Sequence, residues 1–165
     1  MKTKKVAFLG VSIALAMILS YVESQIPALV AIPGIKVGLP NLVIVFLLYK
    51  MSWKDATIVS IIRILLVAMV FGQNIMMVSF SIAGAVLSLT SMILLKKTNW
   101  FSTITVSIVG GIFHNIGQIL AAILWTETVG IVTYLPVLLI SGTVAGAVVG
   151  LISGMLVERL KKWRF

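Results

Sequence analysis

The sequence lacks cysteine and has few acidic residues, and histidine occurs once. With no cysteine it has no disulfide framework and no thiolate metal site, and a lone histidine argues against a zinc site made only of protein ligands. The four carboxylates, Glu23, Asp55, Glu127 and Glu158, are dispersed and cannot form a clamp for a magnesium diphosphate. There is also no Walker A motif and no serine with a base and an orienting group. We therefore expect no enzymatic activity, no bound metal and no cofactor.

What the sequence does have is apolar residues. They make up 61% of the 165 residues, whereas charged residues make up 10%, and the mean hydropathy is +1.20. This composition is typical of an integral membrane protein with a single domain. The net charge of +9 needs no nucleic-acid partner, because membrane insertion already explains where the basic residues lie.

Apolar runs close to the length that crosses about 30 Å of hydrocarbon predict an all-α bundle of six transmembrane helices. We expect these helices at about 6–26, 39–53, 55–71, 75–95, 103–125 and 134–157. Turn signals separate them, including a capping box at 52–55. The second helix is short, since a helix over 40–53 reaches only about 20 Å.

The lysines and arginines indicate the orientation. If there are six spans, all of the 13 basic residues except Lys36 and Arg63 fall on one side of the membrane. Basic residues concentrate in cytoplasmic loops, so we expect both termini in the cytoplasm and a multi-pass protein of the cell membrane, most consistent with a bacterial cytoplasmic membrane. An N-terminal signal peptide is less favoured, because the run over 6–26 is long enough to span and lacks a small-residue cleavage site before Glu23.

Polar residues interrupt three of the apolar runs. A charge in hydrocarbon costs on the order of several kcal/mol, so each such residue is a candidate for a functional site. With a rise of about 1.5 Å per residue, Arg63 lies near mid-membrane, Glu23 near the outer end of its helix, and His114, Asn115 and Gln118 between the middle and the outer third. The polar side chains therefore gather in the outer half, where we expect an outward-facing pocket.

The first loop, at 27–39, contains prolines, glycines and Lys36, and cannot form a regular helix. Irregular backbone at membrane depth is tolerated only where protein or a water-filled cavity covers it. We therefore predict a re-entrant or lid-like first external loop over the pocket. Lys36 is a candidate ligand contact, although a solvated or snorkelling lysine is the simpler interpretation.

Structural interpretations remain open for these residues. Glu23 and Arg63 could form a buried ion pair that only fixes helix packing, and the polar residues of the fifth span could be interhelical hydrogen bonders. Trp125 lies at a predicted membrane interface, where it could anchor the helix or stack on a ligand. The shared location of the polar residues on one side of the membrane favours a site.

Small residues form two stripes. One occupies every fourth position of the sixth predicted span: Gly142, Gly146, Gly150 and Gly154. Such a stripe lets another helix approach closely, and we favour packing within one chain. The other stripe lies near the cytoplasmic end of the first span, at Ala7, Gly10 and Ala14, where contact with a partner protein is more plausible.

Four segments carry a resemblance to a known family: PGIKVGLPN at 33–41, RILL at 63–66, FSIAGA at 80–85 and GGIFHNIGQ at 110–118. With them, the chain resembles the Gx transporter family, often labelled heptaprenyl diphosphate synthase component I. That family is similar to the substrate-binding S components of energy-coupling factor (ECF) vitamin transporters. The resemblance covers nearly the whole chain. It departs at Pro40, where a small residue is expected before Asn41.

The resemblance implies a six-helix bundle whose outward-facing pocket, capped by the first loop, binds a small molecule. In S components a small-residue stripe on the first helix docks onto a transmembrane coupling subunit, which two cytosolic ATPases drive. Carried over to this chain, the docking stripe is Ala7, Gly10 and Ala14. The pocket then uses Lys36, Asn41, Arg63, His114, Asn115 and Gln118.

Three functions are compatible with these patterns. The leading hypothesis is a substrate-binding subunit of an ECF-type importer that captures a vitamin-like, flavin-like, or quinone or isoprenoid-precursor ligand. Arg63 and Lys36, with His114 as a further candidate, would attract an anionic or zwitterionic group of the ligand, and Glu23 would balance Arg63 in the empty pocket. The alternative is a noncatalytic membrane subunit beside a prenyl diphosphate synthase or an extracytosolic electron-transfer assembly, which predicts a packed bundle without an outward cavity. A channel-forming oligomer is disfavoured, because the inner half offers no continuous polar path.

Overall fold

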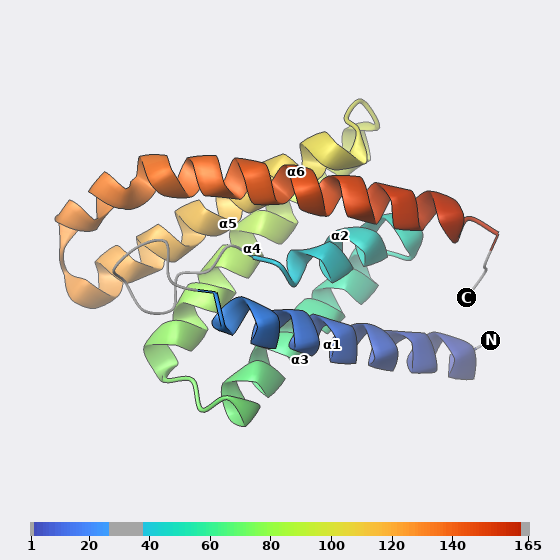
Figure 1. Cartoon of the computed structure of the whole chain (residues 1–165), viewed down its shortest axis with the longest axis horizontal. Helices are drawn as coiled ribbons and strands as arrows, with labels where there is room; N and C mark the ends of the chain where they lie inside the picture. The colour runs from blue at the N-terminus through green and yellow to red at the C-terminus, as the bar shows by residue number, and fades with distance from the viewer. Residues whose placement is uncertain (1, 27–37, 163–165) are drawn as a thin grey trace.

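The computed structural model of the chain describes residues 2–26 and 38–162, and within them the fold is all-α (Figure 1). The helices are α1 (Lys2–Ser24), α2 (Asn41–Lys50), α3 (Trp53–Val70), α4 (Ile75–Thr98), α5 (Thr103–Thr126) and α6 (Leu135–Arg159), with a short 3-10 helix, η1 (Val129–Tyr134), before α6. Each predicted span corresponds to one of the six α-helices. Of the predicted lid at 27–39, the part over 27–37, with Lys36, lies outside the described residues.

Four segments are long and apolar enough to cross a membrane: Thr3–Ser24, Ile75–Thr98, Thr103–Thr126 and Val129–Arg159. They give the chain the character of a multi-pass membrane protein. The helix α2 has only 10 residues, and α3 carries Lys54, Asp55 and Arg63. Membrane crossing by these two helices, and the side on which the termini lie, stay predictions.

Side-chain caps fix where three of the helices begin. Ser52 accepts a hydrogen bond from the backbone N–H of Asp55 at 3.2 Å, and its hydroxyl donates to the Asp55 carboxylate at 2.7 Å. Asn74 and Ser102 cap α4 and α5 in the same way. Each cap satisfies one of the N–H groups that a helix start leaves without a partner. The start of α3 predicted at 52–55 therefore carries its Ser52 cap, with the Asp55 carboxylate bonded to the Ser52 hydroxyl.

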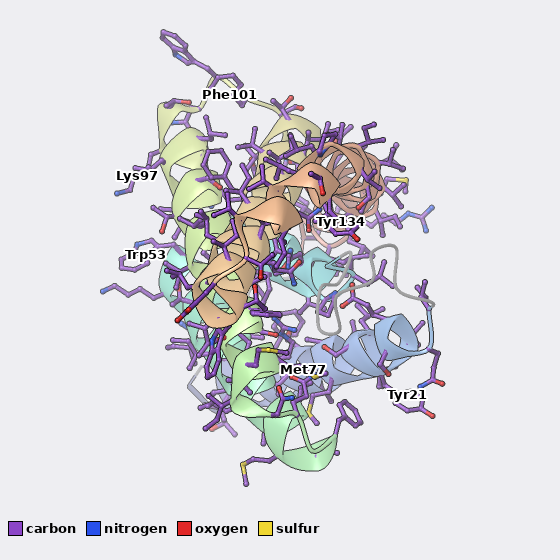
Figure 2. All side chains as sticks on the ribbon, turned by 90° about the vertical axis from the view of Figure 1, so that its left-hand side faces the viewer. Tyr21, Trp53, Met77, Lys97, Phe101 and Tyr134 are labelled. Carbon is purple, nitrogen blue, oxygen red and sulfur yellow. The ribbon has the colours of Figure 1, made fainter. Side chains whose placement is uncertain are left out.

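The outward-pointing side chains are mostly hydrocarbon (Figure 2). Among them, Val6 is 68% exposed, and Met69 and Leu124 are each 80% exposed. In water such a surface would be a strong drive to aggregation. In a bilayer the same side chains face acyl chains, which are as apolar as they are.

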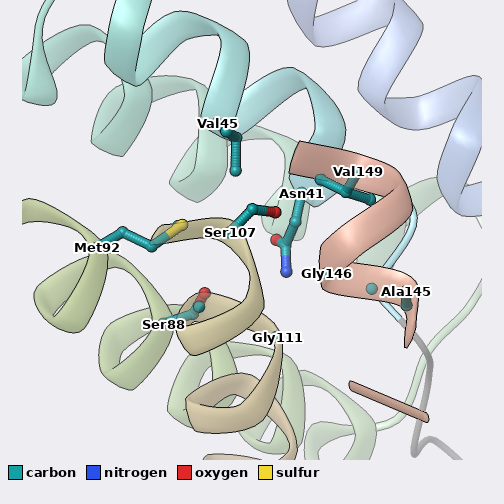
Figure 3. A pocket seen from close by; sticks show the side chains of 11 residues that line it. Asn41, Val45, Ser88, Met92, Ser107, Gly111, Ala145, Gly146 and Val149 are labelled. Atoms are coloured by element: carbon teal, nitrogen blue, oxygen red, sulfur yellow. The ribbon is translucent and has the colours of Figure 1, made fainter. Parts of the chain in front are cut away.

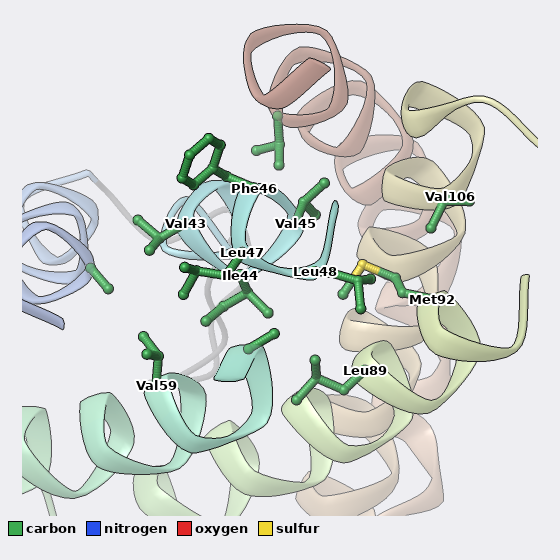
Figure 4. Packing of buried hydrophobic residues seen from close by; sticks show 13 residues of the cluster. Val43, Ile44, Val45, Phe46, Leu47, Leu48, Val59, Leu89, Met92 and Val106 are labelled. Atoms are coloured by element: carbon green, nitrogen blue, oxygen red, sulfur yellow. The ribbon is translucent and has the colours of Figure 1, made fainter. Parts of the chain in front are cut away.

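The short helix α2 lies at the centre of the bundle and contacts α1, α3, α5 and α6. Its six residues over 43–48 are all apolar and between 0 and 7% exposed, and they form the middle of the main hydrophobic cluster (Figure 4). A helix that is apolar on every side is one that is enclosed on every side. Because protein rather than lipid surrounds it, α2 does not need the length of a lipid-facing span.

The glycine stripe of α6 lies against α5. A Cβ atom added to Gly146 would lie 2.7 Å from the Ile108 Cα atom, and one added to Gly150 would lie 2.7 Å from the Ile104 Cα atom. Gly142 meets the backbone of Gly111 in the same way, whereas Gly154 has only an ordinary contact. The stripe therefore brings two helices of the same chain into close contact.

The second stripe, Ala7, Gly10 and Ala14, lies on an exposed face of α1. Apart from the backbone of α1 itself and the two chain neighbours, no atom of the described residues comes within 4 Å of a Cβ added to Gly10. Since α1 packs on α2 and α3, this face is open within the described part of the chain. Docking of a partner there stays a prediction.

Three lysines connect helices at one end of the molecule, which we call the lysine end. Lys5 forms an ion pair with Asp55 (2.8 Å), Lys50 donates to the Leu160 carbonyl (2.5 Å), and Lys96 donates to the Leu48 carbonyl. These contacts gather the start of α1, the end of α2, the start of α3 and the ends of α4 and α6. In Figure 1 the start of α1 and the end of α6 lie at the same end of the molecule.

Candidate ligand-binding cavity

A cavity lies toward the end opposite the lysine end, where α1 finishes and α2 begins. We call it the Arg63 cavity. Its lining comes from five helices and the segments beside them: Glu23, Gly38, Pro40, Asn41, Arg63, Ile64, Val67, Gln73, Ser81, His114 and Gln118. The cavity volume is about 20 Å³, enough for a water-sized molecule, so a larger ligand requires the surrounding side chains to move apart. Five residues predicted from the sequence to bind a ligand thus meet around one space.

Arg63 is the cation of this cavity. It comes from the middle of α3 and is 8% exposed. Its Nη1 donates to the Ser20 hydroxyl at 3.4 Å, and its Nε has no hydrogen-bond partner in the described part of the chain. A guanidinium stays charged in proteins and offers five N–H donors. Arg63 therefore retains a donor for an acceptor placed in the cavity.

Glu23, 6% exposed, connects α1 to the start of α2. One of its carboxylate oxygens accepts the backbone N–H groups of Gly38 and of Leu39, the latter at 3.1 Å. Gly38 has φ +94°, in the left-handed region that suits glycine. The Glu23 carboxylate also interacts electrostatically with the Arg63 guanidinium. It therefore balances the buried cation while it holds the backbone at the cavity rim.

His114 and Gln118 lie one turn apart on α5 and are 5% and 1% exposed. The imidazole of His114 is placed between two glycines. A Cβ added to Gly84 would lie 2.8 Å from the His114 Cε1 atom, and one added to Gly38 would lie 3.6 Å from its Cδ2 atom. The i, i+4 spacing puts both side chains on the face that lines the cavity.

Asn115 does not line this cavity. It is 0% exposed, and its Nδ2 donates to the Leu138 carbonyl of α6 at 2.6 Å. One residue along a helix turns the side chain by about 100°, so the neighbour of His114 faces a different helix. Trp125 is also outside the lining, 50% exposed near the end of α5. Lys36 lies outside the described residues.

Three polar contributors were not predicted from the sequence. Gln73 and Ser81 line the cavity, and Ser20 accepts from Arg63. Gln73 lies in the turn between α3 and α4, and at the sequence level such a turn only separates one predicted helix from the next. Serines such as Ser20 and Ser81 are common in membrane helices, where most bond to their own backbone. The presence of a serine in an apolar run therefore does not by itself indicate a binding site.

The cavity combines a cation with spare donor capacity, a carboxylate, three amides and an imidazole. These groups can recognise a small polar or charged molecule through hydrogen bonds. In the described part of the chain there is no group of three or more histidine, aspartate or glutamate side chains placed to hold a metal ion. The arrangement is suited to binding.

Comparison with known proteins gives one match. A family model described as heptaprenyl diphosphate synthase component I matches residues 12–156. The matched range contains every residue that lines the Arg63 cavity. No curated protein and no solved structure matches the chain.

Proposed function

The chain belongs to the heptaprenyl diphosphate synthase component I family, and we propose that it is the substrate-binding membrane subunit of an ECF-type importer. In this function the Arg63 cavity faces the outside of the cell and captures a vitamin-like, flavin-like, or quinone or isoprenoid-precursor molecule. The observation that carries the proposal is the buried Arg63 guanidinium, which lines a cavity and has an Nε donor without a partner among the described residues.

The cavity favours a ligand with an anionic or zwitterionic group. Hydrogen bonds between a guanidinium and a carboxylate or phosphate are charge-assisted and about twice as strong as neutral ones. Glu23 balances Arg63 when the cavity is empty, and Asn41, His114 and Gln118 add polar contacts. Apolar side chains in the same lining suit a hydrocarbon or aromatic part of the ligand.

The proposed partner is a transmembrane coupling subunit with cytosolic ATPases. Two features support it: the face of α1 that carries Ala7, Gly10 and Ala14 is exposed, and small residues allow close approach of a second helix. By the positive-inside rule, the basic residues of the lysine end support a cytoplasmic position for that end. A subunit oriented in this way would present its cavity to the outside and its lysine end to the ATPases.

The family's name favours a second candidate. The chain could be a noncatalytic membrane subunit that assembles with a prenyl diphosphate synthase or with an extracytosolic electron-transfer assembly. Prenyl elongation itself needs clustered aspartates with bound metal, and this sequence has only four dispersed carboxylates. A partner subunit of this kind has no need for a polar cavity around Arg63, so the cavity supports the importer.

The test is to purify the protein in mild detergent and identify any co-purifying compound by mass spectrometry. In the Arg63→Ala variant, the occupancy by this compound should fall more than about tenfold, since removing one partner of a buried charged contact costs about 2–5 kcal/mol. Lys97→Ala removes an exposed cation at the lysine end and should retain it. Equal occupancy in Arg63→Ala would contradict the assignment of Arg63, and a wild-type protein with no bound compound would favour the second candidate.

A further inference from the structure

A second cavity is lined by residues of α2, α4, α5 and α6 (Figure 3). We call it the Ser88 cavity. Its lining is Gly38, Asn41, Val45, Ser88, Met92, Ser107, Gly110, Gly111, Ala145, Gly146 and Val149. Its volume of about 10 Å³ is room for one small polar group or a water molecule. Gly38 and Asn41 also line the Arg63 cavity. The two cavities are therefore neighbours that share one wall.

The hydroxyls in the Ser88 cavity differ from most others in the helices. Ser12, Ser81 and Ser91 each donate to a carbonyl of their own helix, at 2.8, 3.1 and 2.8 Å. Ser88 and Ser107 are 1% and 3% exposed, and their hydroxyls have no partner in the described part of the chain. Figure 3 shows both oxygens and the Asn41 amide directed toward the same space. A buried hydroxyl without a partner is costly, so the cavity calls for an occupant.

The lining also specifies the chemistry of the occupant. None of the side chains that line the Ser88 cavity carries a charge, in contrast to the Arg63 cavity with Glu23 and Arg63. A serine hydroxyl both donates and accepts, and so does an amide. An ion without a counter-charge is disfavoured in such surroundings. The cavity suits an uncharged oxygen, such as a carbonyl, a hydroxyl or a water molecule.

We propose that the Ser88 cavity is the second compartment of the binding site, and that it takes an uncharged carbonyl or hydroxyl group of the molecule whose charged group binds at Arg63. This inference rests on the proposed function. Ser81 and Ser88 on α4, and Ser107 and His114 on α5, are each seven residues apart, which corresponds to about 10 Å along a helix. The bound molecule should therefore carry a charged group and a neutral polar group separated by about 10 Å, with Asn41 between them.

Access to the Ser88 cavity can be tested without knowing the ligand, because the chain has no cysteine. Ser88→Cys and Ser107→Cys are treated with hydroxyethyl methanethiosulfonate, which is neutral, and with sulfonatoethyl methanethiosulfonate, which is similar in shape and anionic. Ser81→Cys, in the Arg63 cavity, is the accessible reference. Ser153→Cys is the buried reference: Ser153 is 0% exposed, outside both linings, and bonded to the Leu42 carbonyl.

The neutral reagent should modify both Ser88→Cys and Ser107→Cys at least about tenfold faster than the anionic reagent does, because the lining offers no counter-charge. It should also react with them faster than with Ser153→Cys, while Ser81→Cys reacts with both reagents. No modification at either position, or equal rates with the two reagents, would overturn the proposal of a neutral compartment.

A second measurement separates a ligand group from a resident water. The compound released from wild-type protein and identified by mass spectrometry is titrated into the double variant Ser88→Ala/Ser107→Ala and into Ser153→Ala. Loss of hydrogen bonds to the compound should weaken its binding to the double variant by about tenfold, with little change in Ser153→Ala. Unchanged affinity in the double variant would mean that water alone fills the Ser88 cavity, and this would overturn the proposal that a ligand group binds there. The occupancy measured for Arg63→Ala tests the proposed function independently.

Discussion

The two ends of the molecule use polar residues in opposite ways. At the lysine end, Lys5, Lys50 and Lys96 each bind an acceptor on another helix. At the cavity end, Arg63 lies deeper in the protein than any of these lysines, yet its Nε has no partner among the described residues. Buried polar groups in folded proteins are nearly always hydrogen-bonded. The unused donor of Arg63 supports the proposal that a ligand binds at the cavity end.

The largest expected effect comes from removing the carboxylate that balances Arg63. Glu23→Leu leaves the guanidinium without its compensating charge, and breaking a buried pair in this way costs about 3–5 kcal/mol. It also removes the acceptor for the Gly38 and Leu39 N–H groups. We expect the midpoint temperature of unfolding in detergent to fall clearly. Tryptophan fluorescence during heating measures this midpoint.

The double variant Glu23→Leu/Arg63→Met is the matched control for that experiment. Replacing both charges by apolar side chains should restore much of the lost stability, while the bound compound remains absent. An unchanged unfolding midpoint in Glu23→Leu would contradict the electrostatic balance between the two residues. A double variant as unstable as the single one would show that the Glu23 contacts to the backbone matter more than its charge.

A smaller effect is expected at the lysine end. Lys96 donates to the Leu48 carbonyl, and its ammonium lies 5.1 Å from the centre of the Tyr49 ring. Lys96→Met should cost about 1–2 kcal/mol of stability and leave occupancy by the bound compound unchanged. The neighbouring Lys97→Met, at an exposed position, serves as the control and should change neither quantity. A loss of the bound compound in Lys96→Met would contradict the claim that the lysine end stabilises the fold without affecting ligand binding.

Much of this fold could be predicted from the sequence, because helix length and hydrophobicity are local properties. The runs at 75–95 and 103–125 gave α4 and α5 to within a few residues, and the Ser52 capping box gave the start of α3. The central position of α2 could not be predicted. Its shortness was evident, but whether protein or lipid surrounds a short apolar helix depends on the packing of helices distant in the sequence.

The sequence predicts which residues of the candidate site lie in the same part of the bundle along the helices, but not which direction their side chains face. Counting residues along the helices placed Glu23, Arg63, His114 and Gln118 between the middle and the outer end of the bundle, and all four line the Arg63 cavity. Asn115 was grouped with them by depth, but the rotation of α5 directs it to the Leu138 carbonyl. Depth follows from position in a span, whereas the facing of a side chain depends on which helices are neighbours.

The orientation of the two ends is the premise of the importer, and cysteine labelling in intact cells tests it most directly. Gln73→Cys, at the Arg63 cavity, and Lys97→Cys, at the lysine end, are treated with a membrane-impermeant maleimide before and after permeabilisation. We predict that Gln73→Cys is labelled in intact cells and that Lys97→Cys is labelled only after permeabilisation. Labelling of Lys97→Cys from outside, with Gln73→Cys protected until the membrane is opened, would contradict a cavity that captures molecules from outside the cell.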